Sequence, residues 1–257
     1  MTTQWLPDLV GDELVALTRS LGEPAKDLVI LAEGNVSERL PDGRLVIKTS
    51  GANMATSVPE EFVVVDVDPL TELLLAGSTS QADVTAALDA GDHGGARRRA
   101  SIETLIHVAV QHIQPSRFVA HTHPTPIVSL LASVHAATAF EEWVYSDEAV
   151  VIGRPLFVPY AEPGIALGRL FLERLRGYVD EHDELPSLVL LGNHGLVAIA
   201  ATAQGAEAIT LMAVKGARVR LGALSVGGVA GLGSDVVAKY FQREDMVERR
   251  RQLSGTP

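Results

Sequence analysis

The residue types best suited to chemistry gather between positions 101 and 123. Glu103 lies in a segment whose apolar residues recur at helical spacing, and His121 and His123 end a short apolar run. The first pattern predicts a helix over 102–113, and the second predicts a strand over 117–123 that stops at a proline. Side chains two apart on a strand share a face, so both imidazoles point the same way. We therefore predict a pair of metal ligands near a carboxylate.

The best candidate for a third ligand is His194, in the polar turn Leu191-Gly192-Asn193-His194-Gly195-Leu196 between two apolar runs. A lone histidine in an apolar strand is usually a hydrogen-bonded core residue, but three histidines with an acid favour a cation site. Imidazole suits zinc first, with manganese, cobalt and iron as alternatives. Three protein nitrogens leave a coordination position open, which is typical of catalytic sites.

One segment of the N-terminal half has the composition of an anion-binding loop. Lys48-Thr49-Ser50-Gly51 ends a predicted hairpin whose turn is Pro41-Asp42-Gly43. Small and hydroxylated residues at a strand end let backbone N–H groups converge on an anion, and Lys48 would add positive charge. The run Arg97-Arg98-Arg99, shortly before Glu103, is a second source of charge, although such runs are more often solvated faces.

These residues must be positioned by alternating helices and strands in one large domain over 1–257. We expect its core to span about 10–225 and a charged helical extension to span 234–252. Further predictions are helices over 8–21, 83–88, 126–133, 168–181 and 204–224, strands over 61–69, 188–191 and 196–200, an extended segment over 150–160, and a surface excursion over 77–100.

Composition narrows the class of protein. The chain has 257 residues, of which 47% are apolar, and no cysteine, so a zinc site here must use histidine and carboxylate. A net charge of −11 argues against nucleic-acid and anionic-membrane partners. The N-terminus has no basic region or long apolar run, and no later stretch has the length of a membrane span. We therefore expect a soluble, cytoplasmic protein.

Other catalytic classes fit the sequence less well. In a familiar type of zinc hydrolase, His-x-His after a strand is followed by a nearby Asp and His, whereas this chain continues Pro124-Thr125-Pro126-Ile127. The chain also has no Gly-x-Ser-x-Gly elbow, no phosphate-binding loop of the Gly-x-x-x-x-Gly-Lys type and no dinucleotide fingerprint.

The order of the short motifs resembles the class II aldolase and adducin-head family, which includes fuculose-phosphate and rhamnulose-phosphate aldolases and ribulose-phosphate 4-epimerases. The resemblance covers about residues 10–225. The motifs, in chain order, are Gly34-Asn35-Val36-Ser37, Lys48-Thr49-Ser50-Gly51, Ser101-Ile102-Glu103 with His107, His121-Thr122-His123 and Asn193-His194-Gly195. The resemblance implies a three-layer α/β/α fold with a central, mainly antiparallel sheet.

The resemblance also implies roles for individual residues. His121, His123 and His194 would hold zinc, and Glu103 would be the base that moves the proton. Tyr145 is similar to a tyrosine that reaches a neighbouring subunit's site as a proton donor, which implies a homotetramer with cyclic symmetry. The positions that would hold the substrate phosphate are Gly34, Asn35, Ser50, Gly51 and Ser101.

The implied reaction is a zinc-dependent retro-aldol cleavage of a ketose or ketose phosphate through a metal-stabilised enediolate. A decarboxylase of a 3-keto sugar acid phosphate or a sugar-phosphate 4-epimerase would use the same scaffold. A non-catalytic adducin-like interaction module is a further alternative, although such heads lack the three histidines. Ile102 replaces the second serine of many members, and the epimerases tend to have Asp in place of Glu103.

Overall fold

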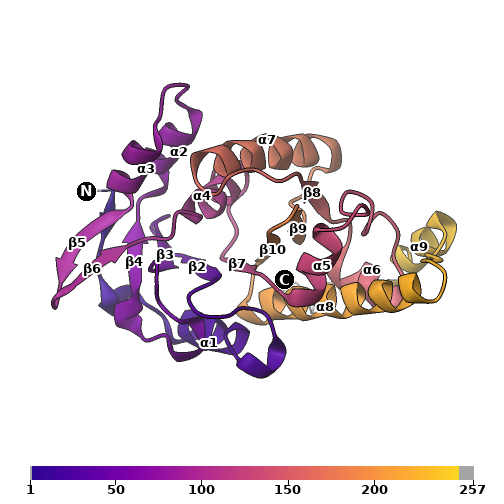
Figure 1. Cartoon of the computed structure of the whole chain (residues 1–257). Coiled ribbons are helices and arrows are strands. Elements are labelled where there is room, and N and C mark those ends of the chain that lie inside the picture. Colours follow the sequence, from indigo (N-terminus) through magenta and orange to yellow (C-terminus); the bar gives the residue numbers. More distant parts are fainter. Residues whose placement is uncertain (1, 249–257) are drawn as a thin grey trace.

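The computed structural model describes residues 2–248, and Figure 1 shows its central sheet between two layers of helices. Within these residues the sheet has eight strands in the order β1-β4-β3-β2-β7-β10-β9-β8. Only β8 and β9 run parallel among its paired strands. The strands are β1 (Thr3–Gln4), β2 (Asn35–Arg39), β3 (Leu45–Lys48), β4 (Phe62–Val65), β7 (Phe118–Thr122), β8 (Leu156–Val158), β9 (Leu188–Leu191) and β10 (Gly195–Ala200). The predicted fold class is confirmed.

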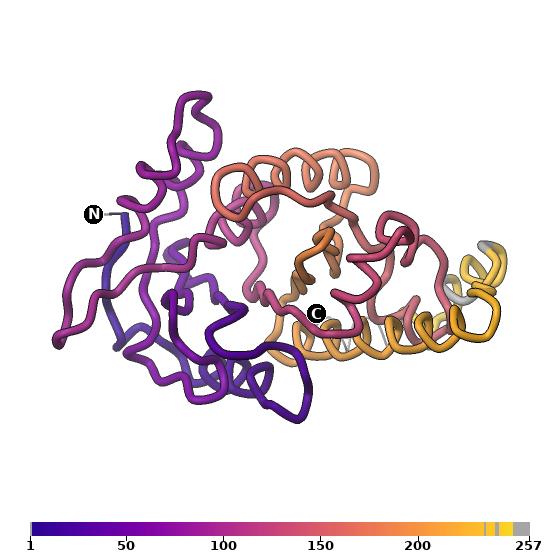
Figure 2. The backbone as a smooth tube through the Cα atoms, in the orientation of Figure 1, coloured from indigo at the N-terminus to yellow at the C-terminus, as the bar shows by residue number. Residues whose placement is uncertain are grey.

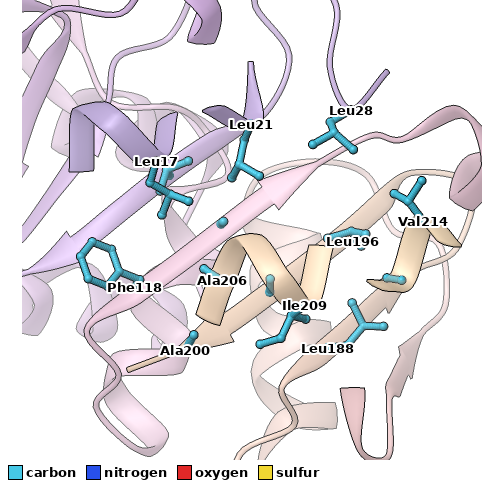
Figure 3. Close-up of a cluster of buried hydrophobic side chains, with 14 of the residues drawn as sticks. Leu17, Leu21, Leu28, Phe118, Leu188, Leu196, Ala200, Ala206, Ile209 and Val214 are labelled. Carbon is cyan, nitrogen blue, oxygen red and sulfur yellow. The ribbon is translucent and has the colours of Figure 1, made fainter. Parts of the chain in front are cut away.

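Each face of the sheet buries its own apolar core beneath one layer of helices. Figure 3 shows part of the first core, where Leu17, Phe118 and Ile209 come from a helix, a strand and another helix. Helices over this face are α1 (Asp12–Leu21), α5 (Thr125–Leu131), α6 (Ser146–Ile152) and α8 (Ala203–Ser225). Helices over the other face are α2 (Val67–Leu75), α3 (Gln81–Ala87), α4 (Thr104–Ile113) and α7 (Ile165–His182).

The sheet joins the two halves of the chain at its centre. In Figure 2 the indigo and purple N-terminal part lies on one side and the orange part on the other. Strand β7 lies between them, paired with β2 on one edge and β10 on the other. Residues at the end of β7 therefore meet segments from both halves of the chain.

The strand predicted over 61–69 is shorter than expected. It ends at Val65, and α2 begins at Val67 with Pro69 in its first turn. A proline is tolerated there because the first backbone N–H groups of a helix have no partner within the helix. Pro69 therefore accompanies the start of a helix and does not mark the end of the strand.

The extended segment predicted over 150–160 is also partly wrong. Residues 150–152 finish helix α6, and only 156–158 form a strand. A buried ion pair between Glu148 of α6 and Arg220 of α8 holds this helix, and Arg220 also donates to the carbonyl oxygens of Ala139 and Glu142. Tertiary contacts thus override the strand propensity of the β-branched run Val150-Val151-Ile152.

The excursion over 77–100 contains the predicted short helix, α3, and an unpredicted hairpin of β5 (Asp89–His93) and β6 (Ala96–Arg99). Arg98 lies over the ring of Trp5, while Arg97 forms an ion pair with Asp89. Side chains alternate along a strand, so Arg97 and Arg99 share the face that Arg98 does not.

The predicted C-terminal helix is interrupted. Helix α9 spans Ser234–Phe241 and ends before Arg243, so a continuous helix from 234 is wrong, and positions 249–252 lie outside the described residues. Among the helices of residues 2–248, none combines the length and apolar content that a membrane crossing requires.

Candidate metal centre

The end of strand β7 sets the position of His121. In the sheet register it lies opposite Asn35 of β2 and Val197 of β10. The His121 side chain is fully buried, and its Nδ1 lies 2.8 Å from the carbonyl oxygen of Leu196. A carbonyl only accepts hydrogen bonds, so Nδ1 carries the proton. When the ring is neutral, the lone pair is therefore on Nε2, the nitrogen that faces the cluster.

His123 and His194 complete a group of three imidazoles. Nε2 of His123 lies 2.8 Å from Nε2 of His121, so these two rings point at one place. His194 follows Asn193, whose φ of 52° lies in the left-handed region that asparagine tolerates. A Cβ on Gly195 would collide with the carbonyl oxygen of Thr122, so only glycine lets this turn approach β7 so closely.

Glu103 closes the cluster from a different element. It occupies the N-cap position of α4, which begins at Thr104, so the helix predicted from residue 102 starts two residues later than expected. Its Oε1 lies 2.8 Å from Nε2 of His194, and its Oε2 lies 3.3 Å from Nε2 of His121. The amide nitrogen of Asn35 donates to the same Oε2 at 2.9 Å. The carboxylate is therefore oriented by three side chains.

Asn35 is in turn held by His107, which is fully buried. Nε2 of His107 lies 2.5 Å from Oδ1 of Asn35, and Nδ1 lies 2.8 Å from Oγ of Ser37. Burial lowers the pKa of His107 to about 3, so the ring is neutral at pH 7. His107 is thus joined to Glu103 through Asn35.

These residues fit a divalent cation. One ligand atom from each of Glu103, His121, His123 and His194 can be chosen so that all four lie within 4.8 Å of one another. Nitrogen and carboxylate oxygen are the ligands that zinc and its neighbours prefer when thiolates are absent. The cluster can therefore hold a metal ion.

Strong coupling between the acid and the histidines determines the charges of the cluster without a metal. Burial opposes charge on Glu103, but His121 and His194 outweigh it and hold the pKa of Glu103 far below its usual range. Burial also opposes charge on His121, yet the Glu103 carboxylate raises the pKa of His121. Burial and the neighbouring positive rings lower the pKa of His123 to about 3.

The structure brings the predicted substrate-binding residues close to this cluster. Asn35 also donates to Oγ of Ser101 at 3.3 Å. Gly34 has a φ of 68°, and a Cβ there would lie 2.7 Å from the carbonyl oxygen of His121. The N–H of Ser50 donates to the carbonyl oxygen of Arg99 at 2.8 Å, which draws the loop at Ser50 and Gly51 towards Ser101. Space beside Gly51 is open, since a Cβ there would meet nothing within 4 Å.

Lys48 does not present its charge to this loop's surface as the sequence suggested. Its side chain is buried, and Nζ lies 2.7 Å from the carbonyl oxygen of Ala52, 3.2 Å from that of Thr49 and 3.4 Å from that of Ala32. Burial lowers the pKa of Lys48 to about 8. The ammonium group instead ties the loop before Gly34 to the loop after Thr49.

Tyr145 lies away from the contacts of the cluster within its own chain. It precedes α6 and donates its hydroxyl to Sδ of Met212 at 2.6 Å, while Nζ of Lys215 lies 5.0 Å from its ring. Burial raises the pKa of the Tyr145 phenol to about 12. Among the described residues, none of these contacts joins Tyr145 to a member of the cluster.

A cleft of about 330 Å³ opens beside His123 and His194. Sequence reasoning missed its two acids, Asp27 and Glu33, although Glu33 directly precedes the Gly34-Asn35 motif and this adjacency was the available signal. The rest of its lining is apolar or hydroxylated, from Val29, Ile30, Thr125, Val128, Ser129 and Ala132. The cleft gives a small polar molecule access to the cluster.

Comparison with known proteins places the chain among class II aldolase folds. A structure of YgbL from Klebsiella pneumoniae, a putative aldolase/epimerase/decarboxylase, is 21% identical with a TM-score of 0.66, over 91% of this chain and 98% of that chain. L-fuculose-1-phosphate aldolase from Thermus thermophilus is 22% identical with a TM-score of 0.59, over 84% and 98%. The N-terminal class II aldolase domain of a conserved protein from Thermoplasma acidophilum is 23% identical with a TM-score of 0.62, over 82% and 92%.

At these sequence identities, the similarity between this chain and the solved structures is a similarity of fold. No curated protein sequence matches the chain significantly. The family model described as Class II Aldolase and Adducin N-terminal domain matches residues 12–221, which include every strand of the sheet except β1 and all four members of the cluster. The chain belongs to the class II aldolase and adducin N-terminal domain family.

Proposed function

We propose that this protein is a divalent-metal-dependent aldolase, with zinc as the first choice, that cleaves a ketose or ketose phosphate by a retro-aldol reaction. The observation that carries the proposal is the convergence of three imidazoles and one carboxylate within 4.8 Å beside an open cleft. A bound cation supplies Lewis-acid stabilisation of negative charge on the substrate's carbonyl and neighbouring hydroxyl oxygens. His121, His123 and His194 would hold it through their ring nitrogens.

Glu103 is the proton carrier in this proposal. His121, His123 and His194 would each offer an unprotonated ring nitrogen to the cation, so Glu103 would no longer be held by ion pairs with protonated rings. Asn35 continues to orient the carboxylate through Oε2 at 2.9 Å. In the cleavage direction Glu103 would take the proton of the substrate's hydroxyl as the carbon–carbon bond breaks to give an aldehyde and an enediolate. Glu103 would then deliver that same proton to the carbon that held the bond.

The phosphate of a ketose phosphate would lie over Ser50, Gly51 and Ser101. Gly51 combines a φ of 86° with open space, and Ser101 lies on the same side as Glu103 through its contact with Asn35. Lys48 is enclosed by carbonyl oxygens, so we infer that Arg99 supplies the positive charge. Within residues 2–248, Arg99 forms no ion pair, and its backbone is bonded to Ser50.

A second subunit would complete the site. Family resemblance supports a homotetramer with cyclic symmetry, in which Tyr145 of one chain serves the aldehyde oxygen in the site of its neighbour. Within its own chain the Tyr145 hydroxyl contacts Met212 and its ring faces Lys215, and neither contact involves the cluster, which favours this arrangement over a role within the chain. Closed homo-oligomers are also common among proteins.

Decarboxylation of a 3-keto sugar acid phosphate and 4-epimerisation are the competing reactions, and the description of YgbL as a putative aldolase/epimerase/decarboxylase spans all three. The deciding experiment measures metal content by elemental analysis and screens free ketoses and ketose phosphates, with aldehyde and carbon dioxide followed in parallel. We expect about one ion per chain, lost in His121→Ala and His194→Ala, and aldehyde release. Carbon dioxide release would identify a decarboxylase, and a wild-type chain without bound metal would favour the adducin-like module.

A further inference from the structure

Glu33 is a carboxylate that faces a histidine of the cluster from the cleft. Its Oε2 lies 3.7 Å from Nδ1 of His123. The same oxygen accepts the backbone N–H of Ile30 at 3.1 Å, and the N–H of Glu33 donates to the carbonyl oxygen of Ile30 at 3.0 Å. The loop therefore holds this side chain in place, although it is 38% exposed.

The two ring nitrogens of His123 face different partners. Nε2 lies 2.8 Å from Nε2 of His121 and points into the cluster, whereas Nδ1 faces Glu33. A neutral imidazole carries a proton on only one nitrogen. At 3.7 Å the Glu33 carboxylate is beyond hydrogen-bond length from Nδ1, but its negative charge attracts a proton on that nitrogen. Glu33 therefore favours the form with the proton on Nδ1 and a lone pair on Nε2, the atom that would bind a cation.

The three histidines differ in the group that their Nδ1 atom faces. His121 has the carbonyl oxygen of Leu196 at 2.8 Å from its Nδ1. Nδ1 of His194 is buried and has no hydrogen-bond partner among the described residues. For His123, the group behind Nδ1 is a charged side chain, which raises the basicity of the opposite nitrogen more than a neutral acceptor does.

Asp27 lines the same cleft and is a natural control. It is an acid like Glu33, but its Oδ1 accepts the hydroxyl of Thr125 at 3.0 Å, and no ion pair joins it to a histidine of the described residues. Its φ of 55° is a conformation that asparagine also adopts, so Asp27→Asn removes one charge from the cleft without straining the backbone.

We propose that Glu33 is a positioning residue that orients His123 for the metal ion through the Nδ1 proton. This inference rests on the proposed metal site and adds to it a residue behind a ligand. Carboxylates in this position fix the ring and its tautomer, and their loss typically costs about 10- to 100-fold in metal affinity.

The test is the zinc affinity of the full-length protein, measured by competition with a chromogenic chelator, for wild type, Glu33→Ala, Glu33→Gln and Asp27→Asn. We expect Glu33→Ala to weaken binding by about 10- to 100-fold. Glu33→Gln should recover part of this loss because its amide oxygen keeps a partial negative charge towards Nδ1, and Asp27→Asn should stay near wild type. The absorption intensity of the cobalt-substituted protein should be the same in wild type and Glu33→Ala, because the number of ligands is unchanged.

Four results would overturn the proposal. Equal zinc affinity in wild type and Glu33→Ala would remove the positioning role while leaving the proposed metal site intact. If Asp27→Asn weakened zinc binding as much as Glu33→Ala, the loss of affinity would come from the total negative charge of the cleft. A changed cobalt absorption intensity in Glu33→Ala would indicate that Glu33 is itself a metal ligand. A wild-type chain that binds no zinc or cobalt would contradict the proposed function together with this inference.

Discussion

The amide nitrogen of Asn35 lies 2.9 Å from Oε2 of Glu103, and the amide oxygen of the same residue lies 2.5 Å from Nε2 of His107. One buried amide thus connects the predicted proton carrier to a neutral histidine behind it. The amide can do this because it is both donor and acceptor, and the sheet register places Asn35 opposite His121. The first prediction concerns this link.

Asn35→Ala should retain the metal but lower the turnover rate by about 10- to 100-fold, because a hydrogen bond to a charged group contributes about 1.5–3 kcal/mol. It should also lower the free energy of unfolding by about 1–3 kcal/mol, because His107 loses its acceptor. Steady-state kinetics and urea denaturation measure the two effects. Asn53→Ala, which removes a turn cap remote from the cluster, is the matched control. Full activity in Asn35→Ala would show that Glu103 needs no such support.

Glu103→Gln should keep the bound metal, since three imidazoles remain, yet lose at least about 10²-fold in rate, the usual contribution of a positioned acid or base. The substitution preserves the size of the side chain and removes only its ability to carry the proton. Elemental analysis and turnover on the substrate found in the screen provide the measurement. Unchanged turnover would remove Glu103 from the mechanism.

Arg99→Gln should weaken the binding of inorganic phosphate, measured by calorimetry on the metal-loaded protein, by about tenfold or more, because a charge-assisted hydrogen bond to an anion is lost. Arg97→Gln is the control, because Arg97 shares the strand and the face but is paired with Asp89. Equal losses in both variants would indicate only the general positive charge of the hairpin. If the wild-type protein did not bind inorganic phosphate, this would favour the hypothesis of an unphosphorylated substrate.

His107 should make stability depend on pH. Its pKa is about 3 in the folded protein, against an ordinary value of 6.5. Between these values the unfolded chain binds a proton that the folded chain does not, so the contribution is present above pH 6.5 and is lost as the pH falls towards 3. The slope is about 1.4 kcal/mol per pH unit. Urea denaturation at a series of pH values measures how the free energy of unfolding changes with pH. In His107→Asn this change should be smaller by the contribution of one proton, and equal slopes in the two proteins would contradict the assignment.

Mixing inactive Tyr145→Phe subunits with inactive Glu103→Gln subunits should restore part of the activity. In a cyclic assembly some boundaries would then pair an intact Tyr145 with an intact Glu103. Sedimentation of each single variant confirms that it assembles, and activity of the mixed oligomers is the measurement. A monomeric protein, or mixed assemblies that stay inactive, would mean that Tyr145 acts within its own chain or has no part in the reaction.

Much of the architecture was predictable because it depends on local spacing. The apolar residues of 204–224 recur at the period of a helix, and α8 buries Ala206, Ile209 and Ala213 as expected. The alternation up to His123 likewise predicted that His121 and His123 share a face, and their Nε2 atoms lie 2.8 Å apart. The composition of the Asn193-His194-Gly195 turn singled out His194 before any fold was known.

Only the tertiary structure determined the contacts between positions far apart in the chain. The run Val150-Val151-Ile152 has strand propensity, but it finishes a helix in which Glu148 is buried against Arg220. The sequence predicted that Lys48 adds positive charge to the loop, yet its ammonium group is surrounded by three carbonyl oxygens. The only sequence signal of Glu33 is its position before the Gly34-Asn35 motif, and folding alone places it beside His123. Spacing along a chain determines which residues share a face, whereas burial and electrostatic partners are set by what packs against that face, and these neighbours come from distant segments.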